Sequence, residues 1–320
     1  MRKPGHGARM RPIRAGVVGA GVFGGYHAQK YAGLEGVRLT AIADASRPAA
    51  EATAARFGAR SMSSLGEFAA TVDVATIATP ATTHYAVARQ LIDAGVHVLV
   101  EKPLALTLAE ADDLIARARS CSVTLQVGHQ ERFVLAATGL LSRGRAPRSV
   151  VCRRAGPWTG RCTDVGVVMD LMIHDLDLVH QLVDTPLRGA QAVGRRLHGD
   201  DADEVSAELM FGSNCQVHLF ASRISETRER MMRIEYEDGV VELDFIRRTL
   251  INTTPAHLTP PGEGDAVQRA IAVDPLSYAV SEFVRAVREG REPFVNGQGA
   301  RRALASALSI LEVAECREAA

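Results

Sequence analysis

The sequence has no excess of either charge. Its 320 residues include 37 Lys and Arg and 37 Asp and Glu, so the formal net charge is zero. Proteins that bind nucleic acid or an anionic membrane over a broad surface carry an excess of basic residues. The balance favours neither partner, although a local basic patch at a substrate site stays open. We expect a small-molecule ligand, with no nucleic acid and no membrane.

Paired cysteines and long apolar runs are also missing. Cys121, Cys152, Cys162, Cys215 and Cys316 are odd in number and show no C-x-x-C spacing. This argues against a disulfide framework and a structural zinc site, and it is typical of a reducing compartment. No apolar stretch is long enough to span a bilayer, and no apolar segment of signal-peptide length follows the basic first residues. We expect a cytoplasmic protein.

Apolar residues are present in sufficient number for a sizeable core. They make up 47% of the chain, and its length suggests about two domains. Helices alternate with buried strands before about residue 130, and short strands dominate after it. We expect one domain over residues 12–130 and a second over residues 131–320, with the last helices able to pack back on the first domain.

The stretch 17–25, Val-Val-Gly-Ala-Gly-Val-Phe-Gly-Gly, predicts a buried strand that enters a glycine turn, with a helix beginning directly after it. Gly19, Gly21 and Gly24 have the G-x-G-x-x-G spacing of dinucleotide sites. There, the first glycine makes the turn, the second lets the backbone approach a pyrophosphate, and the third lets the helix pack close to the strand. Ordinary βα turns also use glycine, but the context favours a nucleotide site.

Asp44 strengthens this interpretation. It ends a second predicted strand, 39–43, and an acid about 20 positions past the glycines is placed for the ribose hydroxyls. Its charge would repel a 2′-phosphate, which favours NAD. Ser46 and Arg47 directly beyond could bind that phosphate, so NADP stays an alternative.

Strands and helices continue to alternate through the first half. Predicted strands at 72–78, 96–100 and 123–127 are separated by helices at 84–94 and after Thr107. This order predicts a doubly wound parallel sheet, in which ligands bind at the carboxyl ends of the strands. The groups at those ends are the glycine turn, Asp44, Thr79-Pro80, Glu101-Lys102 and His129.

Lys102 is the strongest single candidate for catalysis. Most lysines that follow a strand are surface residues. Lys102, however, lies at the ligand edge of the sheet, between Glu101 and a proline that restricts its backbone. A lysine held in this way could hydrogen-bond a substrate hydroxyl and stabilise an alkoxide.

The segment 165–183 predicts a helix in the second half. Asp170, His174 and Asp177 recur at i, i+4 and i+7, which would place them on one helical face. A solvated stripe is the commonest meaning of such a pattern. A metal site and an acid/base pair, with His174 exchanging a proton and Asp170 orienting it, are the alternatives. A dinucleotide site nearby favours the acid/base pair and no metal.

The remaining second half predicts an α+β fold. Strands at 190–197, 204–211, 215–222, 230–236, 239–246 and 248–252 are joined partly by tight turns, which indicates an open, mainly antiparallel sheet. Its exposed face could serve for dimerisation. Helices are expected at 277–289 and 300–315.

The order of these motifs resembles the glucose–fructose oxidoreductase/inositol dehydrogenase/rhizopine catabolism (Gfo/Idh/MocA) family. The resemblance covers roughly residues 13–314 and rests on the glycine turn, the strand-end acid, Thr-Pro-x-x-x-His, Glu-Lys-Pro and Asp-x-x-x-His. It implies an NAD(P)-dependent dehydrogenase that oxidises a sugar or cyclitol hydroxyl, with a Rossmann domain before the substrate domain, and a homodimer or homotetramer. By position, Lys102, Asp170 and His174 would be catalytic and contact the substrate. The implied cofactor-binding residues are Gly19, Gly21, Val22, Phe23, Gly24, Asp44, Thr79, Pro80, His84, Glu101 and Lys102.

Two further segments resemble the nucleotide-sugar branch of that family. They are 128–133, Gly-His-Gln-Glu-Arg-Phe, and 161–165, Arg-Cys-Thr-Asp-Val. The resemblance is strongest to UDP-N-acetylglucosamine 3-dehydrogenases that prepare an amino sugar for lipid A, although Val134-Leu135 replaces their usual Asn-Pro. Arg132 and Arg161 could bind a pyrophosphate or carboxylate of the substrate, since guanidinium pairs bidentately with such anions. Ordinary salt bridges are the alternative for both.

Three other functions stay open at this stage. An inositol or free-sugar dehydrogenase of the same family would use the same catalytic residues. A sensor could keep the cofactor fold without the chemistry, although the complete set of Lys102, Asp170 and His174 argues against it. A metal-dependent lyase or hydrolase would use Asp170, His174 and Asp177.

Overall fold

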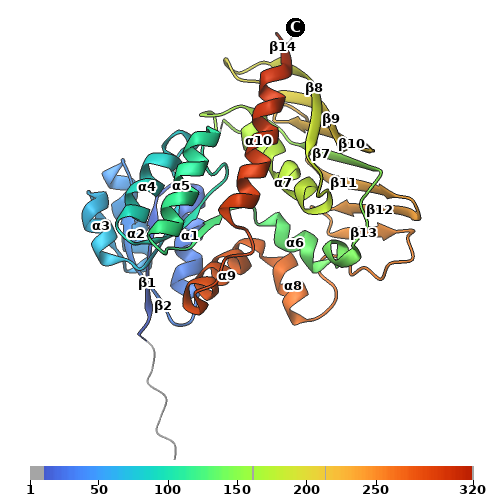
Figure 1. Cartoon of the computed structure of the whole chain (residues 1–320). Coiled ribbons are helices and arrows are strands. Elements are labelled where there is room, and N and C mark those ends of the chain that lie inside the picture. Colours follow the sequence, from blue (N-terminus) through green and yellow to red (C-terminus); the bar gives the residue numbers. More distant parts are fainter. Residues whose placement is uncertain (1–10, 161, 213, 319–320) are drawn as a thin grey trace, which may run out of the picture.

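The computed structural model describes residues 11–160, 162–212 and 214–318. Two sheets organise this part of the chain (Figure 1). The first lies with its helices on one side of the molecule, and the second lies on the other, with the long helix α10 between them. No helix in the described ranges is long and apolar enough to cross a membrane.

The first sheet is parallel, with strand order β3-β2-β1-β4-β5-β6. This is the order of a dinucleotide-binding fold, and it confirms the predicted Rossmann sheet. The strands are β1 Ile13–Val18, β2 Val37–Ala43, β3 Arg60–Met62, β4 Val74–Ile77, β5 His97–Val100 and β6 Leu125–Val127. The helices are α1 Val22–Gly33, α2 Arg47–Phe57, α3 Leu65–Thr71, η1 Ala81–Thr83, α4 His84–Asp93 and α5 Leu108–Ser120.

The local sequence explains these elements. All four residues of β4 are buried, as expected for a strand covered on both faces. Thr107 and Glu110 form a capping box at the start of α5, in which each side chain accepts from the other's backbone N–H. Gly58 ends α2 in the left-handed conformation that glycine adopts most easily.

The second sheet is mixed but mainly antiparallel, with order β13-β12-β11-β7-β10-β9-β8-β14. The pairs β10–β7 and β14–β8 are parallel. The strands are β7 Ser149–Ala155, β8 Leu187–Arg196, β9 Glu204–Phe211, β10 Cys215–Ser222, β11 Glu229–Tyr236, β12 Gly239–Asp244, β13 Thr249–Asn252 and β14 Ala314–Glu318. The predicted class, a Rossmann sheet followed by an α+β unit with an open sheet, is confirmed.

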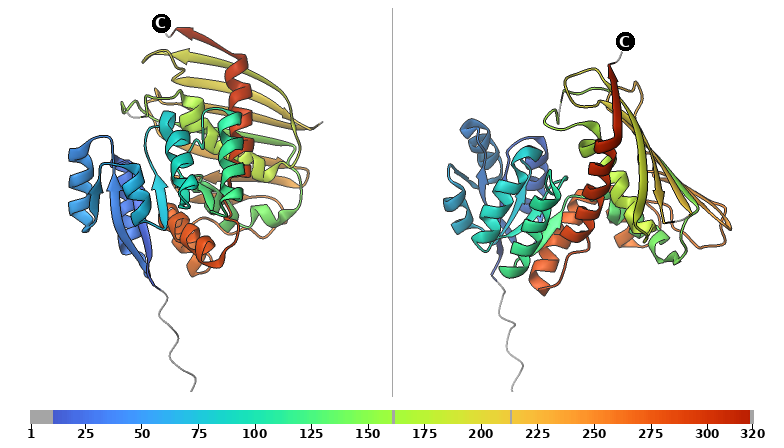
Figure 2. Two further views of the ribbon diagram at one scale, coloured as in Figure 1. Left: turned by 60° about the vertical axis from the view of Figure 1, so that its left-hand side comes forward. Right: turned by 45° about the horizontal axis from the view of Figure 1, so that its top comes forward.

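Helices gather on one face of this second sheet, which we call its inner face (Figure 2). Burial alternates along β9, because the opposite face carries no such cover. The helices of this half are α6 Glu131–Ala137, η2 Leu140–Arg143, η3 Val168–Met172, α7 Ile173–Leu182, α8 Ala266–Val273, α9 Pro275–Glu289 and α10 Gly297–Val313.

Helix α9 joins the two halves. Phe283 and Val284 of α9 lie in one buried cluster with Tyr31 of α1 and residues of β1 and β2. Lys30 of α1 also donates to Asp274, just before α9, at 2.6 Å. The last part of the chain therefore packs against the Rossmann sheet.

Two expectations about the helices were wrong in detail. The segment 165–183 does not form one α-helix, because residues 168–172 make a π-helical turn, η3, before α7 begins. The final helix ends at Val313 rather than Glu315, and the next residues form β14 at the edge of the second sheet. Helices α6 and α8 and strand β3 had not been predicted.

Candidate functional site

A cavity of about 460 Å³ lies at the carboxyl ends of the first sheet's strands. Such an edge is where open α/β sheets bind ligands. Residues of the second half, Cys162, Asp164, Val165 and Asp170, close its other side. The sequence-predicted residues that line it are Gly19, Gly21, Val22, Phe23, Asp44, Thr79, Pro80, His84, Glu101, Lys102 and Asp170.

The glycine turn has the geometry of a phosphate cradle. Gly19 has φ +99°, and a Cβ there would collide with the carbonyl of Ala78. Above Gly21 the space is open, whereas Gly24 packs against the carbonyl of Gly19. Helix α1 has no side-chain cap and no acid in its first turn, so its N-terminal N–H groups can donate hydrogen bonds to an anion. These features fit a dinucleotide pyrophosphate.

Asp44 lies at the end of β2, beside this turn. Its carboxylate accepts from the backbone N–H of Ala20 at 2.6 Å and from that of Ser46 at 2.7 Å. These bonds fix the carboxylate but leave lone pairs for a ribose diol. Arg47, the alternative ligand for a 2′-phosphate, pairs instead with Glu51 at 2.7 Å.

Lys102 and Asp170 meet across the cavity. Lys102 Nζ donates to Asp170 Oδ1 at 2.7 Å and to the Asp170 carbonyl at 2.6 Å. The two side chains are 15% and 14% exposed, so a ligand in the cavity can still reach them. The π-helical turn η3 carries Asp170 to this position, and the pair links the two halves of the chain at the site.

Glu101 is held beneath Lys102. His27 Nε2 and Glu101 Oε1 are hydrogen-bonded at 2.8 Å, and the other ring nitrogen of His27 faces Thr76 Oγ1 at 3.2 Å. Burial by itself would raise the pKa of Glu101, but the bond with His27 and the charge of Lys102 lower it below its ordinary value. Glu101 therefore carries a negative charge directly beside Lys102 in the chain.

His84 is almost fully buried at the edge of the cavity. Its Nδ1 lies 2.7 Å from the Pro103 carbonyl and its Nε2 lies 3.0 Å from that of Thr79. Burial lowers the pKa of His84, so its ring is neutral at pH 7 and donates to only one of these carbonyls. His84 thus ties together the two chain segments that carry Thr79 and Lys102.

His174, the fourth residue after Asp170, makes an edge-to-face contact with His129, with the ring centroids 5.9 Å apart. Burial lowers the pKa of His174 well below its ordinary value, and the charges of Lys102 and Arg154 lower it further. Nδ1 of His174 and both ring nitrogens of His129 are buried without a hydrogen-bond partner among the described residues. A neutral His174 can accept a proton from a ligand.

Of Asp170, His174 and Asp177, the last points away from the site. Asp170 bonds Lys102 rather than His174, and Asp177 is fully buried in an ion pair with Arg132. Asp170 lies in the π-helical turn, whereas His174 and Asp177 lie in α7. Within the described ranges no three His, Cys, Asp or Glu side chains are grouped so that they could hold a metal ion.

The two arginines predicted as anion ligands have different outcomes. Arg132 is 3% exposed, and it donates to Asp177 Oδ2 at 3.0 Å and to the Phe294 carbonyl at 3.0 Å. It therefore makes the salt bridge that was the alternative, and its guanidinium is not presented to a ligand. Arg161 lies outside the described residues.

Two residues of the site had not been predicted. Asp164 accepts from the backbone N–H of Ala81 at 2.6 Å and so ties the loop before η3 to the start of η1. No local pattern marks such a long-range bond. His27, by contrast, lies three positions after Gly24 on the buried side of α1. A buried polar residue at such a position predicts a hydrogen-bond partner.

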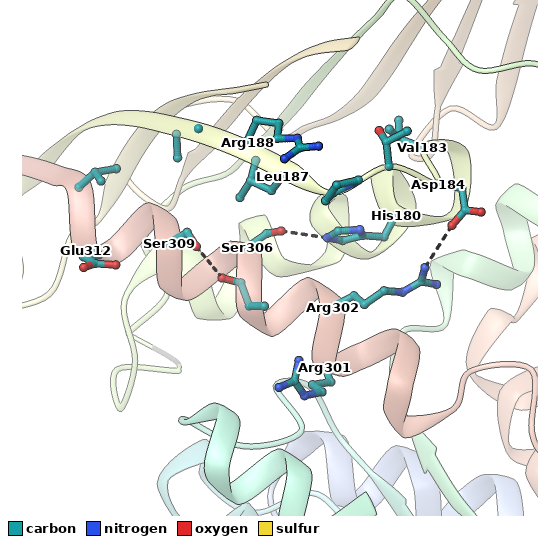
Figure 3. A pocket seen from close by; sticks show the side chains of 16 residues that line it. His180, Val183, Asp184, Leu187, Arg188, Arg301, Arg302, Ser306, Ser309 and Glu312 are labelled. Carbon is teal, nitrogen blue, oxygen red and sulfur yellow. Dashed lines mark hydrogen bonds and ion pairs between the residues drawn. The ribbon is translucent and has the colours of Figure 1, made fainter. Parts of the chain in front are cut away.

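A second cavity, of about 560 Å³, lies between α7, α10 and the start of β8 (Figure 3). Its charged side chains diverge. Arg302 points toward Asp184, Arg301 pairs with Asp112 of α5, and His180 contacts Ser306 at 2.9 Å. The groups do not converge on a common point, so we do not regard this cavity as the active site.

Family models match both halves of the chain. Residues 13–129 match the NAD-binding Rossmann fold of the GFO/IDH/MocA oxidoreductase family, and residues 134–242 match the C-terminal domain of the same family. The chain belongs to this family. The predicted family is confirmed, and the protein is an NAD-binding oxidoreductase.

Individual members of the family are similar to this protein over nearly the whole of its chain. UDP-N-acetylglucosamine 3-dehydrogenase from Acidithiobacillus ferrooxidans is 36% identical over 302 residues, covering 93% of this chain and 96% of the relative. A solved structure of that enzyme has a TM-score of 0.86 at 35% identity and covers 96% of this chain and 99% of its own. Inositol 2-dehydrogenase from Rhizobium meliloti is 27% identical over 96% of this chain and 98% of its own.

A more distant solved structure shares the fold. The WlbA dehydrogenase from Bordetella pertussis, solved with NADH and UDP-GlcNAcA, has a TM-score of 0.82 at 22% identity. It covers 95% of this chain and 96% of its own.

Proposed function

We propose that this chain oxidises a secondary hydroxyl of a nucleotide sugar, the C3 hydroxyl of UDP-N-acetylglucosamine, with NAD as acceptor. The observation that carries the proposal is the Lys102–Asp170 pair, which faces the cavity at the glycine turn. The name of the 36% identical relative supports the choice of sugar.

The roles of the residues follow from their contacts. When bound, NAD supplies the hydride acceptor. Lys102 donates a hydrogen bond to the reacting hydroxyl oxygen and stabilises the negative charge that develops there. His174, neutral because of its low pKa, takes the hydroxyl proton. The alcohol thus loses a hydride and a proton and becomes a ketone.

Asp170 then has a role other than the one predicted from sequence. It holds the ammonium of Lys102 in place, at 2.7 Å, rather than orienting His174. Gly19, Gly21 and Gly24 would hold the pyrophosphate, with Val22 and Phe23 at the start of α1. Asp44 would bind the adenosine ribose, and Thr79, Pro80, His84 and Glu101 would form the wall nearer the nicotinamide.

The proposal divides the work between two domains. Residues 12–130 would bind the cofactor and residues 131–320 the substrate. We further propose a cytoplasmic homo-oligomer, formed through the open face of the second sheet, in the route to the amino sugar of lipid A. The exposed side chains of Val193 and Ile251 on strands of this sheet support an interface, and light scattering of the purified protein would test it.

The first experiment measures absorbance of reduced nicotinamide. Purified protein is mixed with NAD or NADP and with UDP-N-acetylglucosamine, free N-acetylglucosamine, myo-inositol or no sugar. We expect reduction only with the UDP-sugar, and faster with NAD. Lys102→Ala should lower kcat at least 100-fold, since it removes a charge that acts on the transition state. Lys30→Ala, which removes a lysine outside the cavity, should leave kcat unchanged.

The panel also separates the alternatives. Reduction with myo-inositol alone would keep the chemistry and overturn the nucleotide sugar. Full activity of Lys102→Ala would remove Lys102 from the mechanism. NAD binding without turnover of any sugar would favour a sensor.

A further inference from the structure

The inner face of the second sheet opens to solvent at Arg230. Met232, Ile234 and Tyr236 of β11 lie on this face and are at most 4% exposed. Arg230, two positions before Met232, has a side chain that is 52% exposed. The register of β11 with β7 is unbroken from Glu229 to Glu235, so Arg230 belongs to the same face. The helices thus stop covering the sheet at this residue.

Arg230 lies next to the helix that carries His174. Its neighbour on the adjacent strand β7 is Arg154, which donates to Asp175 at 2.8 and 3.1 Å. Asp175 directly follows His174 in the chain. On the other side, the N–H of Phe245 donates to the Arg230 carbonyl at 2.9 Å. Burial lowers the pKa of His174 most, followed by the charges of Lys102, Arg154 and His129, and the charge of Arg230 contributes as well.

The guanidinium of Arg230 has unused hydrogen-bonding capacity. Glu131 lies between the two arginines, but Arg154 engages both of its oxygens. Among the described residues, Arg230 makes one hydrogen bond, to Glu131 Oε1 at 3.3 Å, although its guanidinium has five N–H donors. Two arginines directly opposite on neighbouring strands repel each other. An anion that binds Arg230 would relieve this repulsion.

We propose that Arg230 binds a phosphate group of the substrate while the sugar's reacting hydroxyl lies between Lys102 and His174. This inference rests on the proposed function and assigns its anion-binding residue. It replaces Arg132, whose guanidinium is already occupied. A guanidinium pairs with phosphate and with carboxylate, so the test must separate the two. Phe245, at the same level of the sheet, adds apolar surface beside the anion.

The experiment measures binding by calorimetry on the NADH-loaded protein, which has no hydride acceptor and therefore no turnover. The ligands are UDP-N-acetylglucosamine, UDP and free glucuronic acid, each at two salt concentrations. Arg230→Gln should weaken binding of UDP-N-acetylglucosamine about 10- to 100-fold, the range expected for hydrogen bonds to a charged group. Arg230→Lys, which keeps the charge, should lose less. Arg233→Gln is the matched control, because it removes an arginine from the opposite face of the same strand.

The outcomes are distinct. Weakened binding in Arg230→Gln alone, with unchanged NAD affinity and a smaller salt dependence, would support the inference. Unchanged affinity, or an equal loss in Arg233→Gln, would overturn it. If Arg230→Gln weakened the binding of glucuronic acid but not that of UDP, the anion would be a carboxylate rather than a phosphate, and the inference would be overturned as well. Binding that depends on Arg230 without any turnover would leave the inference standing and refute the proposed function.

Discussion

Replacing Arg132 tests whether this side chain stabilises the fold or binds the substrate. Arg132 and Asp177 are 3% and 1% exposed as side chains, and they form a two-pronged ion pair between α6 and α7. Arg132→Met would leave the carboxylate of Asp177 buried without its partner. Breaking a buried pair in this way costs about 3–5 kcal/mol.

The lost free energy of unfolding can be measured as a fall in Tm. An unfolding entropy of about 2.1 cal/mol/K per residue implies that Tm falls by roughly 4–7 °C for a chain of this length. Substrate KM of the folded variant at 25 °C should stay within about twofold. Arg132→Met/Asp177→Leu, which removes both charges, should recover most of the lost stability. Arg285→Met, which breaks a pair with a half-exposed guanidinium, should change Tm by no more than about 1–2 °C.

The opposite pattern would refute the reasoning. If Arg132→Met kept the wild-type Tm but raised KM for the UDP-sugar tenfold, Arg132 would be a substrate ligand. If the double variant were less stable than Arg132→Met, Asp177 would have another essential partner. Scanning calorimetry and steady-state kinetics on the same preparations distinguish these cases.

Two further predictions concern the base and the cofactor cradle. Burial and the charges of Lys102, Arg154, His129 and Arg230 lower the pKa of His174 and keep its ring neutral as pH falls. We therefore expect kcat/KM to decrease only well below pH 6.5. A decrease of kcat/KM already at pH 7 would contradict this. Gly19→Ala should weaken NAD binding more than tenfold in a fluorescence titration, because its Cβ meets the Ala78 carbonyl at φ +99°. Gly33→Ala, with open space around it, is the control, and equal losses in both would argue against the cradle.

The cofactor side of the site could be predicted because its signals are local. The glycine spacing, Asp44 and the Glu-Lys-Pro segment each follow a strand within a few residues. A parallel sheet then brings the carboxyl ends of its strands to one edge, so knowing the strands is enough to gather the residues. Gly19, Gly21, Asp44 and the Glu-Lys-Pro segment all line the cavity at this edge.

The π-helical turn had no such signal. Residues 165–183 have the apolar spacing of an ordinary helix, and that spacing assigned Asp170 to the face of His174. Residues 168–172 form a π-helical turn instead, and Asp170 within it contacts Lys102, a residue 68 positions away. Lys102 and Asp170 thus meet through a long-range contact that periodicity does not reveal, and their catalytic role stays a prediction.

The arginines show the same limit most clearly. Arg132 and Arg230 are both plausible anion ligands by residue type, and only the position of carboxylates far along the chain separates them. Asp177 is 45 positions from Arg132 and occupies it, whereas Glu131 is 99 positions from Arg230 and is already shared with Arg154. A guanidinium can bind a ligand only with the N–H donors that the fold leaves unused. Arg230, the proposed phosphate ligand, can therefore be identified from the strand register but not from the local sequence.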